Sequence, residues 1–551
     1  MLQTTQGLCR YLENEGGEKF KQRGVVIGRD HRAQQVGVSS EGFARLAAAV
    51  FVSRGFKVYF LGGTVPTPLV AFGVSHLKAC AGVMVTASHN PKMDNGYKVY
   101  WGNGSQIIPP HDKGIAASIK NNLEPWQTYN VVAALSSPKC SDPVDTLAKA
   151  YYQGIRDKLC RRPDANARSG LQVAYSAMHG VGDEWAQRAF EAFSLPPLLS
   201  VASQRLPDPQ FPTVEYPNPE EQGALKEAIR MAEEKGVSLV LANDPDADRL
   251  AAAERQPSGE WHVFSGNEIG VLLGVWQWEE WRRTHPNEDP SKAVMIASTV
   301  SSKMLSAVAK LEGFHFEETL PGFKWMGHRA QELKARGCTI LFAFEEAIGF
   351  GPGDVVFEKD GLSSAAVFCE MVVALREQAA AQAAGEPSSS KPTTGLSLLR
   401  RRLDALHERY GEFTEDNGYV RCEDTEVVSA IFRRLRGNGT YRSSIGGYRV
   451  TAVRDLAAGH GYDSEQPGGK PALPVGGAGT HFLTFKLGDE GVVATLRTSG
   501  TEPKIKYYLE MQGQPGVPLE EVSRRLSVVA DVFVEECLQP KRWGLQRFSW
   551  A

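Results

Sequence analysis

The sequence predicts an α/β protein of three similar layered domains with mixed or parallel sheets, followed by an α+β domain. The chain of 551 residues is too long for one hydrophobic core. Short apolar runs alternate with amphipathic stretches, which is typical of parallel strands joined by crossover helices. Beyond residue 411 the pattern changes to separated strands, which favours an antiparallel sheet. We expect domains at 1–165, 166–290, 291–395 and 396–551.

The composition is that of an ordinary globular chain. Apolar residues make up 42% and charged residues 23%, and the net charge of −3 creates no overall field that attracts nucleic acid or anionic membranes. No apolar run suits a membrane span, and the N-terminus does not resemble a signal peptide. The eight cysteines include no CxxC pair, which argues against a zinc ribbon and suits a reducing compartment. We expect a cytoplasmic monomer without nucleic-acid or membrane partners.

Strands and helices are expected to alternate through the first three domains. In the first, a helix capped by Ser39 or Ser40 follows a strand, and a second helix is expected over 71–79. In the second, helices are expected from 182 and over 223–236. The apolar strands of the three domains are expected at 24–30, 57–63, 81–87, 171–180, 237–243, 293–302 and 338–349.

The C-terminal region begins after a change in composition. Residues 379–395 form a low-complexity, Pro/Ser-rich stretch and are predicted to form a mobile loop or linker. Helices are expected over 396–411 and 519–538. The strands between these two helices are expected at 448–456, 480–487 and 491–500.

A carboxylate cluster follows the predicted strand 237–243. Asp244, Asp246 and Asp248 occupy alternate positions, so their side chains can point the same way and supply the hard oxygen ligands that Mg²⁺ requires. A solvated acidic turn is the simpler alternative for such a motif on its own. The carboxyl edge of a parallel strand is where α/β proteins bind ligands, and this position favours a metal site.

The motif TASHNP at 86–91 also follows an apolar strand. Ser88 lies at a strand-to-turn junction that can hold its hydroxyl forward, while His89 and Lys98 could move protons. Turn formation by Asn90 and Pro91 alone is the alternative. No GxSxG motif surrounds Ser88, which disfavours an α/β-hydrolase triad.

Three further motifs are candidates for ligand contacts. RTSGTEPK at 497–504 combines hydroxyls, a glycine and cations, which predicts an anion-binding nest or a helix cap. Glu345 and Glu346 end a strand and can accept hydrogen bonds from sugar hydroxyls, although a surface acid pair is the simpler interpretation. The remaining motif is TLPGFK at 319–324.

Taken together and in this order, the five motifs resemble the α-D-phosphohexomutase superfamily. TASHNP is similar to its phosphoserine loop, DPDADR to its metal loop, FEEAIG to its sugar loop and RTSGTEP to its phosphate loop. The segments NGYKVYW, TLPGFKWMG and FEEAIGF resemble the phosphoglucomutase-2 (phosphopentomutase) branch most. The resemblance covers nearly the whole chain and implies four domains around one cleft, the last with a TATA-box-binding-protein-like fold.

The resemblance also implies a chemistry. Ser88 would carry the exchanged phosphoryl group, and Ser88 and the three aspartates would bind one Mg²⁺ per chain. The implied activity moves a phosphoryl group between C1 and the terminal hydroxyl of ribose or deoxyribose 1-phosphate, and more weakly converts glucose 1-phosphate to the 6-phosphate, with a sugar bisphosphate as intermediate and activator. Catalytic roles would fall to Ser88, His89, Lys98 and Arg29, and substrate contacts to Arg249, Lys324, Glu345, Glu346, Arg497, Ser499, Thr501 and Lys504.

The sequence departs from the superfamily pattern at two places. Position 347 is Ala where hexose-phosphate mutases typically carry serine, and the lost hydroxyl is expected to relax selection for hexoses. The strand resembling Gly-Thr-Ala-Gly-Leu-Arg that opens superfamily members is absent, so we expect one strand and one phosphate-contacting arginine to be missing. Three alternatives remain open: a glucose 1,6-bisphosphate synthase, a catalytically impaired sugar-phosphate-binding fragment and a metal phosphatase.

Overall fold

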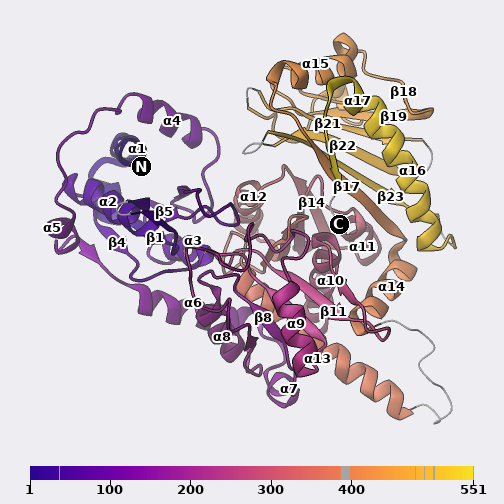
Figure 1. The fold of residues 1–551 in the computed structure, drawn as a ribbon, viewed down its shortest axis with the longest axis horizontal. Helices are drawn as coiled ribbons and strands as arrows, with labels where there is room; N and C mark the ends of the chain where they lie inside the picture. The colour runs from indigo at the N-terminus through magenta and orange to yellow at the C-terminus, as the bar shows by residue number, and fades with distance from the viewer. Residues whose placement is uncertain are drawn as a thin grey trace. The chain divides into compact units, whose positions relative to one another are not determined.

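In the computed structural model the chain divides into two units (Figure 1). Unit 1 comprises residues 1–298 and 313–402, and unit 2 comprises 299–312 and 403–551. The structure describes residues 1–35, 38–385, 397–477, 479–488, 491–499, 503–514 and 516–549. Among these residues, no helix combines the length and apolar character needed to cross a membrane.

Unit 1 contains three sheets with parallel centres, as the alternating pattern predicts. The first sheet has the order β6-β5-β1-β4-β7, in which β1 lies between parallel neighbours β4 and β5. Its strands are β1 (Val25–Arg29), β4 (Val58–Phe60), β5 (Ala81–Val85), β6 (Lys98–Trp101) and β7 (Cys140–Ser141). A separate ribbon of two short strands, β2 (Ala33–Gln35) and β3 (Val38–Ser39), precedes the second helix.

Helices cover both faces of the first sheet because its strands are apolar on both sides. Val25 and Ile27 share a core cluster with α2 (Ser40–Ser53), while Val26 on the opposite face packs against α3 (Thr67–His76) (Figure 1). The α2 helix begins as predicted, because the Ser39 hydroxyl accepts the backbone N–H of Gly42 at 3.0 Å.

The α3 helix corrects one prediction. It spans Thr67–His76, whereas the apolar pattern predicted a helix over 71–79. Pro68 occupies the first turn, where its missing N–H costs no hydrogen bond, so the helix starts four residues earlier than expected.

The second and third sheets repeat the plan of the first. The second has the order β12-β11-β10-β8-β9 and the third has the order β14-β13-β15-β16. Their strands are β8 (Ala174–Ser176), β9 (Leu199–Ser200), β10 (Leu239–Ala242), β11 (Ala251–Arg255), β12 (Trp261–Val263), β13 (Ala293–Ser298), β14 (His315–Thr319), β15 (Thr339–Glu345) and β16 (Gly349–Pro352).

In each of the three sheets the chain reverses direction after a strand that has a parallel neighbour. A strand with a parallel neighbour is followed by an antiparallel one, giving the pairs β5–β6, β10–β11 and β15–β16. The connections between these pairs hold Ser88, the three aspartates and Glu346. Each connection also contains a non-glycine residue with left-handed backbone: Ser88 (φ 53°), Ala247 (φ 56°) and Ile348 (φ 47°). The three candidate loops therefore occupy equivalent places in their sheets, and each contains one residue in a conformation that is costly for an L-amino acid.

The remaining helices of unit 1 include one that corrects a second prediction. The sequence predicts a mobile loop or linker over 379–395, but residues 379–385 continue helix α13 (Gly361–Gly385), because Ala and Gln are good helix formers. The rest of that stretch, 386–395, lies outside the described residues. These helices are α1 (Leu2–Arg23), α4 (His111–Lys120), α5 (Val131–Leu135), α6 (Val144–Leu159), α7 (Pro163–Arg168), α8 (Gly182–Ala192), α9 (Lys226–Lys235), α10 (Gly266–Thr284), α12 (Phe323–Ala335) and α13 (Gly361–Gly385), with the short 3₁₀ turn η1 (Pro290–Lys292).

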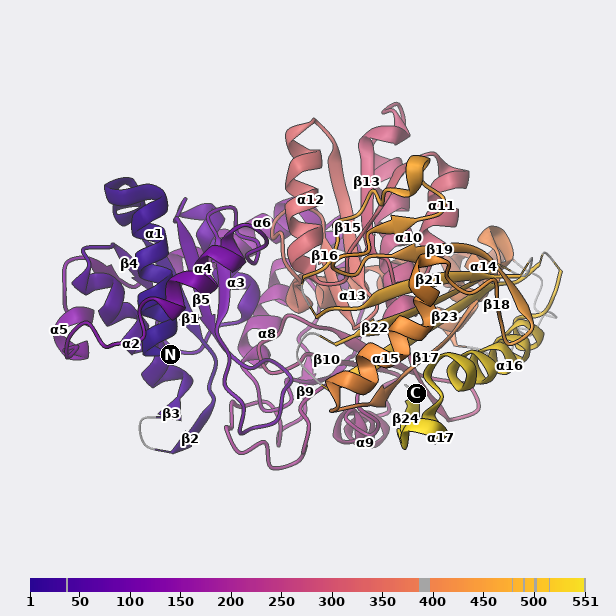
Figure 2. The ribbon, with the colours of Figure 1, turned by 90° about the horizontal axis from the view of Figure 1, so that it is seen from above.

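Unit 2 is the predicted α+β domain, built on one antiparallel sheet of order β18-β19-β21-β22-β23-β17-β24, with β20 beside β19. This sheet with helices on one face is consistent with the TATA-box-binding-protein-like expectation. Helices α15 (Thr425–Arg436) and α16 (Leu519–Leu538) share its buried core and lie on the same face (Figure 2). The strands are β17 (Phe413–Arg421), β18 (Ser444–Ile445), β19 (Tyr448–Asp455), β20 (Tyr462–Asp463), β21 (Phe482–Leu487), β22 (Val492–Thr498), β23 (Lys504–Gln512) and β24 (Arg547–Ser549).

The helical segments associated with unit 2 confirm two predicted helices. The connecting helix α14 and the long α16 match the segments predicted at 396–411 and 519–538. The α14 helix begins in unit 1 and continues into unit 2. These segments are α11 (Met304–Glu312), α14 (Leu398–Tyr410), α15 (Thr425–Arg436), α16 (Leu519–Leu538), α17 (Pro540–Trp543), η2 (Gly437–Gly439) and η3 (Pro467–Gly469).

Candidate active site

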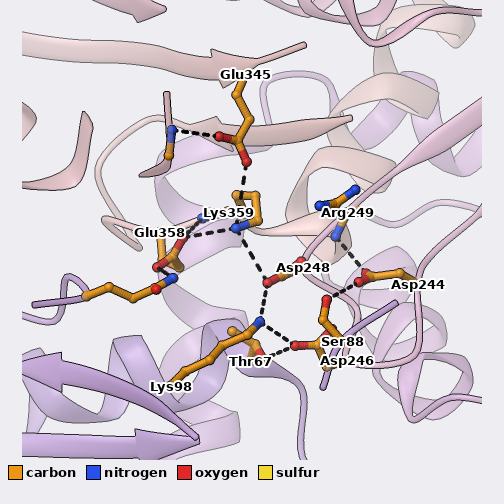
Figure 3. A network of polar contacts seen from close by, with 12 residues as sticks. Thr67, Ser88, Lys98, Asp244, Asp246, Asp248, Arg249, Glu345, Glu358 and Lys359 are labelled. Carbon is orange, nitrogen blue, oxygen red and sulfur yellow. Dashed lines mark hydrogen bonds and ion pairs between the residues drawn. The ribbon is translucent and has the colours of Figure 1, made fainter. Parts of the chain in front are cut away.

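The serine loop and the aspartate loop meet in unit 1, although 156 residues separate them. The Ser88 hydroxyl donates to Oδ2 of Asp244 at 2.8 Å (Figure 3). Thr67, at the start of α3, supports the same contact from the first domain: its hydroxyl donates to Asp246, and its backbone N–H donates to the carbonyl of Asp246 at 2.9 Å. The side chains of Ser88, Asp244 and Asp246 are buried. The predicted juxtaposition of the hydroxyl with the carboxylates is therefore present.

Ser88 is held in its left-handed conformation by contacts on both sides. Its backbone N–H donates to the Thr86 hydroxyl at 2.8 Å. Gly96 packs so closely beneath the loop that an added Cβ would lie 2.1 Å from the Thr86 carbonyl oxygen. A left-handed backbone costs about 1–2 kcal/mol for an L-residue, so the surrounding contacts must outweigh that cost.

Arg32 makes the most hydrogen bonds to this loop, although it was not among the residues predicted from the sequence. Its buried guanidinium donates to the carbonyl oxygens of Ser88 at 2.6 Å, Asn90 at 2.7 Å and Pro91 at 2.8 Å. Asp30 in turn forms an ion pair with Arg32 at 3.3 Å and accepts its backbone N–H at 3.0 Å. The pattern GRDHR at a strand end was the available signal, because a buried Arg requires a carboxylate and several acceptors.

Asp244, Asp246 and Asp248 form a cluster that fits a divalent cation. Candidate ligand atoms of the three lie within 4.8 Å of one another, and all three residues are buried. Within the described part of the chain, Oδ1 of Asp246 and Oδ1 of Asp248 have no hydrogen-bond partner. Burial and the neighbouring carboxylates raise the pKa of Asp244 well above its usual value. Buried, mutually repelling carboxylates with open oxygens are the donor set that a hard cation stabilises.

Two basic side chains lie beside this cluster. The Lys98 ammonium is 2.7 Å from Oδ2 of Asp246 and 2.8 Å from Oδ2 of Asp248. Burial favours the neutral form of Lys98, but the two carboxylates outweigh it and raise its pKa, so Lys98 is protonated. The Nδ1 atom of His89 is 3.4 Å from the Ser88 hydroxyl. Burial, together with the charge of Arg249, lowers the pKa of His89, so this imidazole is neutral.

Arg249 connects the aspartate loop to a separate loop of the same domain. Its backbone N–H donates to Oδ1 of Asp244 at 3.0 Å, and its Nη1 atom donates to Glu220 at 2.9 Å. Burial opposes the charge on Arg249, but Glu220 and Asp244 outweigh it and raise the pKa of the guanidinium.

Glu345, one of the predicted sugar-contacting residues, lies across Lys359 from Asp248 (Figure 3). Glu345 accepts the backbone N–H of Gly322 at 3.1 Å, which brings the start of α12, where Lys324 lies, to the end of β15 (Figure 3). Oε2 of Glu346 accepts the Ser298 hydroxyl at 3.0 Å. The Lys324 ammonium lies 5.6 Å from the centre of the Trp325 ring.

Lys359 is a second residue that the sequence analysis did not single out. Its ammonium lies 3.7 Å from Asp248, 3.8 Å from Glu345 and 3.5 Å from Glu358. Burial opposes its charge, but the three carboxylates raise its pKa, so it is protonated. Lys359 is thus the cation that joins the aspartate loop to the sugar loop (Figure 3). It stands in the unremarkable segment FEKDG, where only tertiary contacts reveal it.

Arg29 does not join this cluster. Its guanidinium is 3.5 Å from Glu41 and donates to the carbonyl of Asp30 at 3.3 Å. Among the contacts of the described residues, none links Arg29 to Ser88 or to the aspartates. Its predicted catalytic role therefore remains a prediction.

The predicted phosphate loop lies in unit 2, on the hairpin between β22 and β23. The Arg497 guanidinium donates to the Tyr508 hydroxyl at 2.8 Å. The Lys504 ammonium lies 4.2 Å from the centre of the Tyr419 ring, and its carbonyl accepts the Ser499 backbone N–H at 2.9 Å. Thr501 lies outside the described residues. The hairpin therefore carries two cations that rest on tyrosine rings.

The chain matches three successive domains of one family. These are alpha/beta/alpha domains I, II and III of the phosphoglucomutase/phosphomannomutase family, over residues 1–126, 149–259 and 265–388.

Curated relatives match over almost the full chain. A human phosphopentomutase is 46% identical over 99% of this chain and 87% of its own length. A human glucose 1,6-bisphosphate synthase is 43% identical, with coverage of 99% and 85%. A probable phosphoribomutase of Schizosaccharomyces pombe is 39% identical, with coverage of 99% and 88%.

Solved structures share the fold at lower identity. A putative phosphomannomutase from Thermus thermophilus aligns with a TM-score of 0.64 and 20% identity, covering 98% of this chain and 94% of that one. The open form of parafusin, a phosphoglucomutase from Paramecium, aligns with a TM-score of 0.64 and 15% identity, covering 98% and 91%.

Proposed function

The chain belongs to the phosphoglucomutase/phosphomannomutase family, and from that premise we propose that it is a phosphosugar mutase acting on ribose or deoxyribose 1-phosphate. It would move the phosphoryl group between C1 and the terminal hydroxyl, and would convert glucose 1-phosphate to the 6-phosphate more weakly. The observation that carries the proposal is the 2.8 Å contact between the Ser88 hydroxyl and Asp244, inside a buried carboxylate trio.

Ser88 is the proposed carrier of the phosphoryl group. In the first step the bond between phosphorus and Oγ of phospho-Ser88 breaks while a bond forms from phosphorus to a sugar hydroxyl oxygen. The hydroxyl proton leaves the sugar, and a proton returns to Oγ of Ser88. His89, next to the Ser88 hydroxyl, and Lys98, next to Asp246 and Asp248, are proposed to carry these protons. The resulting sugar bisphosphate then presents its other phosphoryl group to Ser88.

Charge compensation is the main requirement of such a transfer, because little covalent help is needed. The three aspartates, with a phosphate oxygen on Ser88, would hold one Mg²⁺, and this ion supplies positive charge against the transferring group when bound. Arg249 and Lys359 stand on either side of the aspartate loop and would add two further cations.

The sugar and its second phosphate would be held by other residues. Glu345 ends β15 and Glu346 follows it, and both can accept hydrogen bonds from sugar hydroxyls; Lys324 lies in the first turn of α12. The non-reacting phosphate is assigned to the unit 2 hairpin through Arg497, Ser499, Thr501 and Lys504. Binding energy from that distal group can then be used at the reacting centre. Reorientation of the bisphosphate requires motion of the parts that hold it.

A direct test measures label transfer and isomerisation with the same protein. Wild-type protein with Mg²⁺ is expected to take ³²P from a sugar bisphosphate onto Ser88 and to convert ribose 1-phosphate to the 5-phosphate. The variant Ser88→Ala should do neither while still binding the sugar phosphate. Unchanged turnover in Ser88→Ala would overturn the assignment of Ser88. Binding without label transfer in the wild type would instead indicate a catalytically impaired sugar-phosphate-binding protein, and net phosphate release would indicate a phosphatase.

Glucose 1,6-bisphosphate synthesis is the second candidate function. It is supported by a relative of that name with 43% identity over 99% of this chain. The two activities differ in the phosphoryl donor, so bisphosphate formation from glucose 1-phosphate and a phosphoglycerate donor separates them. A synthase should form bisphosphate faster than it isomerises ribose 1-phosphate.

A further inference from the structure

Arg249 presents one edge of its guanidinium without a partner. Nη1 is bonded to Glu220 at 2.9 Å, and the side chain is only 13% exposed. Nε is buried and has no hydrogen-bond partner within the described ranges of the chain. A guanidinium grips an anion through two parallel N–H bonds from one edge, and the edge that contains Nε is the one opposite Nη1. The contact with Glu220 therefore leaves the Nε edge available.

Arg249 lies next to Asp244 and Ser88 (Figure 3). The backbone N–H of Arg249 donates to Oδ1 of Asp244, and the other oxygen of the same carboxylate accepts the Ser88 hydroxyl. Asp244 thus connects the backbone of Arg249 directly to the oxygen that would carry the phosphoryl group. A buried N–H without an acceptor costs free energy, so an open N–H at this place points to an anionic ligand.

The backbone position of Glu220 is fixed by contacts within its own loop. It lies in the loop between β9 and α9, where its backbone N–H donates to the side-chain oxygen of Asn218 at 3.2 Å. Pro217 and Pro219 are buried on either side of Asn218 and anchor the turn. The Glu220 side chain is 35% exposed, so it approaches Arg249 from the solvent side. The next residue, Glu221, is exposed and forms no ion pair within the described part of the chain.

We infer that Glu220 is a positioning residue, which fixes the Arg249 guanidinium through Nη1 so that its Nε edge is presented to the phosphoryl group on Ser88. The inference rests on the proposed function and adds a residue to it. Glu220 does not touch the transferring group and acts through Arg249. Without the carboxylate, the guanidinium can rotate about its terminal torsions, and the two parallel N–H bonds are lost for part of the time.

The test compares Glu220→Gln with the neighbouring Glu221→Gln, which removes the same charge from the same loop. Glu220→Gln is expected to lower kcat for ribose 1-phosphate about 10-fold, with a smaller change in KM, because the oriented grip matters most in the transition state. Glu221→Gln should retain the wild-type kcat. Glu220→Asp, which keeps the carboxylate on a shorter stem, should recover part of the loss.

A double-mutant cycle separates orientation from a general structural effect. Arg249→Lys lacks the planar fork, so adding Glu220→Gln to Arg249→Lys should change kcat less than two-fold. Equal kcat values for Glu220→Gln and Glu221→Gln would overturn the inference, as would a full 10-fold loss in the Arg249→Lys background. A faster Glu220→Gln enzyme would also overturn it, because Glu220 would then compete with the phosphoryl group. Failure of the proposed function is a different result, namely a wild-type protein without label transfer.

Discussion

Arg32, which lies outside the serine loop, holds that loop in its conformation. One buried guanidinium satisfies three carbonyl oxygens between Ser88 and Pro91 and is itself paired with Asp30. The left-handed backbone of Ser88 persists because these contacts leave the loop few alternatives. The position of the Ser88 hydroxyl therefore depends on a side chain that need not touch substrate.

The variant Arg32→Lys tests this dependence. Lysine keeps the charge beside Asp30 but cannot reach three carbonyls in a fixed plane. We expect kcat to fall by about 10- to 100-fold, because displacement of a nucleophile by a fraction of an ångström has that effect, with a smaller change in KM. Steady-state kinetics with ribose 1-phosphate measure both. Arg45→Lys, on the surface of α2 and paired with Glu41, is the matched control and should behave as wild type.

Ala347 tests substrate selection at the residue scale. The side chain lies in the sugar loop between Glu346 and Ile348, and it offers no hydroxyl. Ala347→Ser is expected to raise kcat/KM for glucose 1-phosphate relative to ribose 1-phosphate by about 5- to 10-fold, the effect of one added hydrogen bond. Competition assays with both sugars measure this ratio. Ala167→Ser, exposed on α7, should leave it unchanged, and an unchanged ratio in Ala347→Ser would contradict the prediction.

At the scale of elements, strand β23 carries a buried acid where it meets the segment before α11. Glu510 accepts the backbone N–H of Lys303 at 2.8 Å and lies directly opposite Glu415 in the antiparallel pair of β23 with β17. Burial, with a smaller contribution from Glu415, raises the pKa of Glu510 to about 7. The folded protein therefore retains a proton on Glu510 at pH values where the unfolded chain has lost it.

This difference in bound protons decides how the free energy of unfolding changes with pH. The folded state binds more protons between pH 4.5 and about 7, so the free energy of unfolding of unit 2 should fall as pH rises through that range. The fall from Glu510 alone is about 3 kcal/mol, because each unit of pKa difference is worth about 1.4 kcal/mol. Glu510→Gln should remove it. Thermal unfolding at pH 5.5 and pH 8 measures the effect, and Glu520→Gln, which changes an exposed acid in α16, should keep the wild-type pH dependence.

At the scale of the whole molecule, the two units have separate hydrophobic cores. The core of unit 2 is formed by its own sheet with α15 and α16, while the aspartate trio and Ser88 belong to unit 1. Ligand binding at the trio therefore stabilises unit 1 directly. Because each unit has its own core, calorimetry is expected to resolve two unfolding transitions.

Addition of Mg²⁺ should raise the Tm of the unit 1 transition and leave that of unit 2 in place. At a hundred-fold excess over Kd the gain is about 2.7 kcal/mol, by mass action. EDTA should reverse the shift, and Asp246→Asn should reduce it strongly. An equal shift of both transitions, or a shift retained in Asp246→Asn, would contradict the assignment of the metal site to this trio.

Features encoded in local pattern could be predicted from the chain. The Ser39 cap, the apolar strands and the terminal helix α16 follow from neighbours a few residues apart, and they were confirmed. The positions of Ser88 and the aspartates could also be predicted, because both follow apolar strands whose carboxyl ends bind ligands in α/β proteins. The predictions of where α3 starts and where α13 ends were wrong, since a proline in a first turn and a run of alanines both suit a helix without an apolar periodicity.

Tertiary structure alone revealed Lys359, Glu220 and the contacts that Arg32 makes with the serine loop. Each acts on groups far along the chain: Arg32 on carbonyls near residue 90, Lys359 on Asp248, and Glu220 on Arg249. Local spacing carries no signal for such pairs, because residues distant in the sequence come into contact only when the chain folds. The pattern of residues thus specifies which strands end in reactive side chains, whereas the packing of those strands decides which charges orient and balance them.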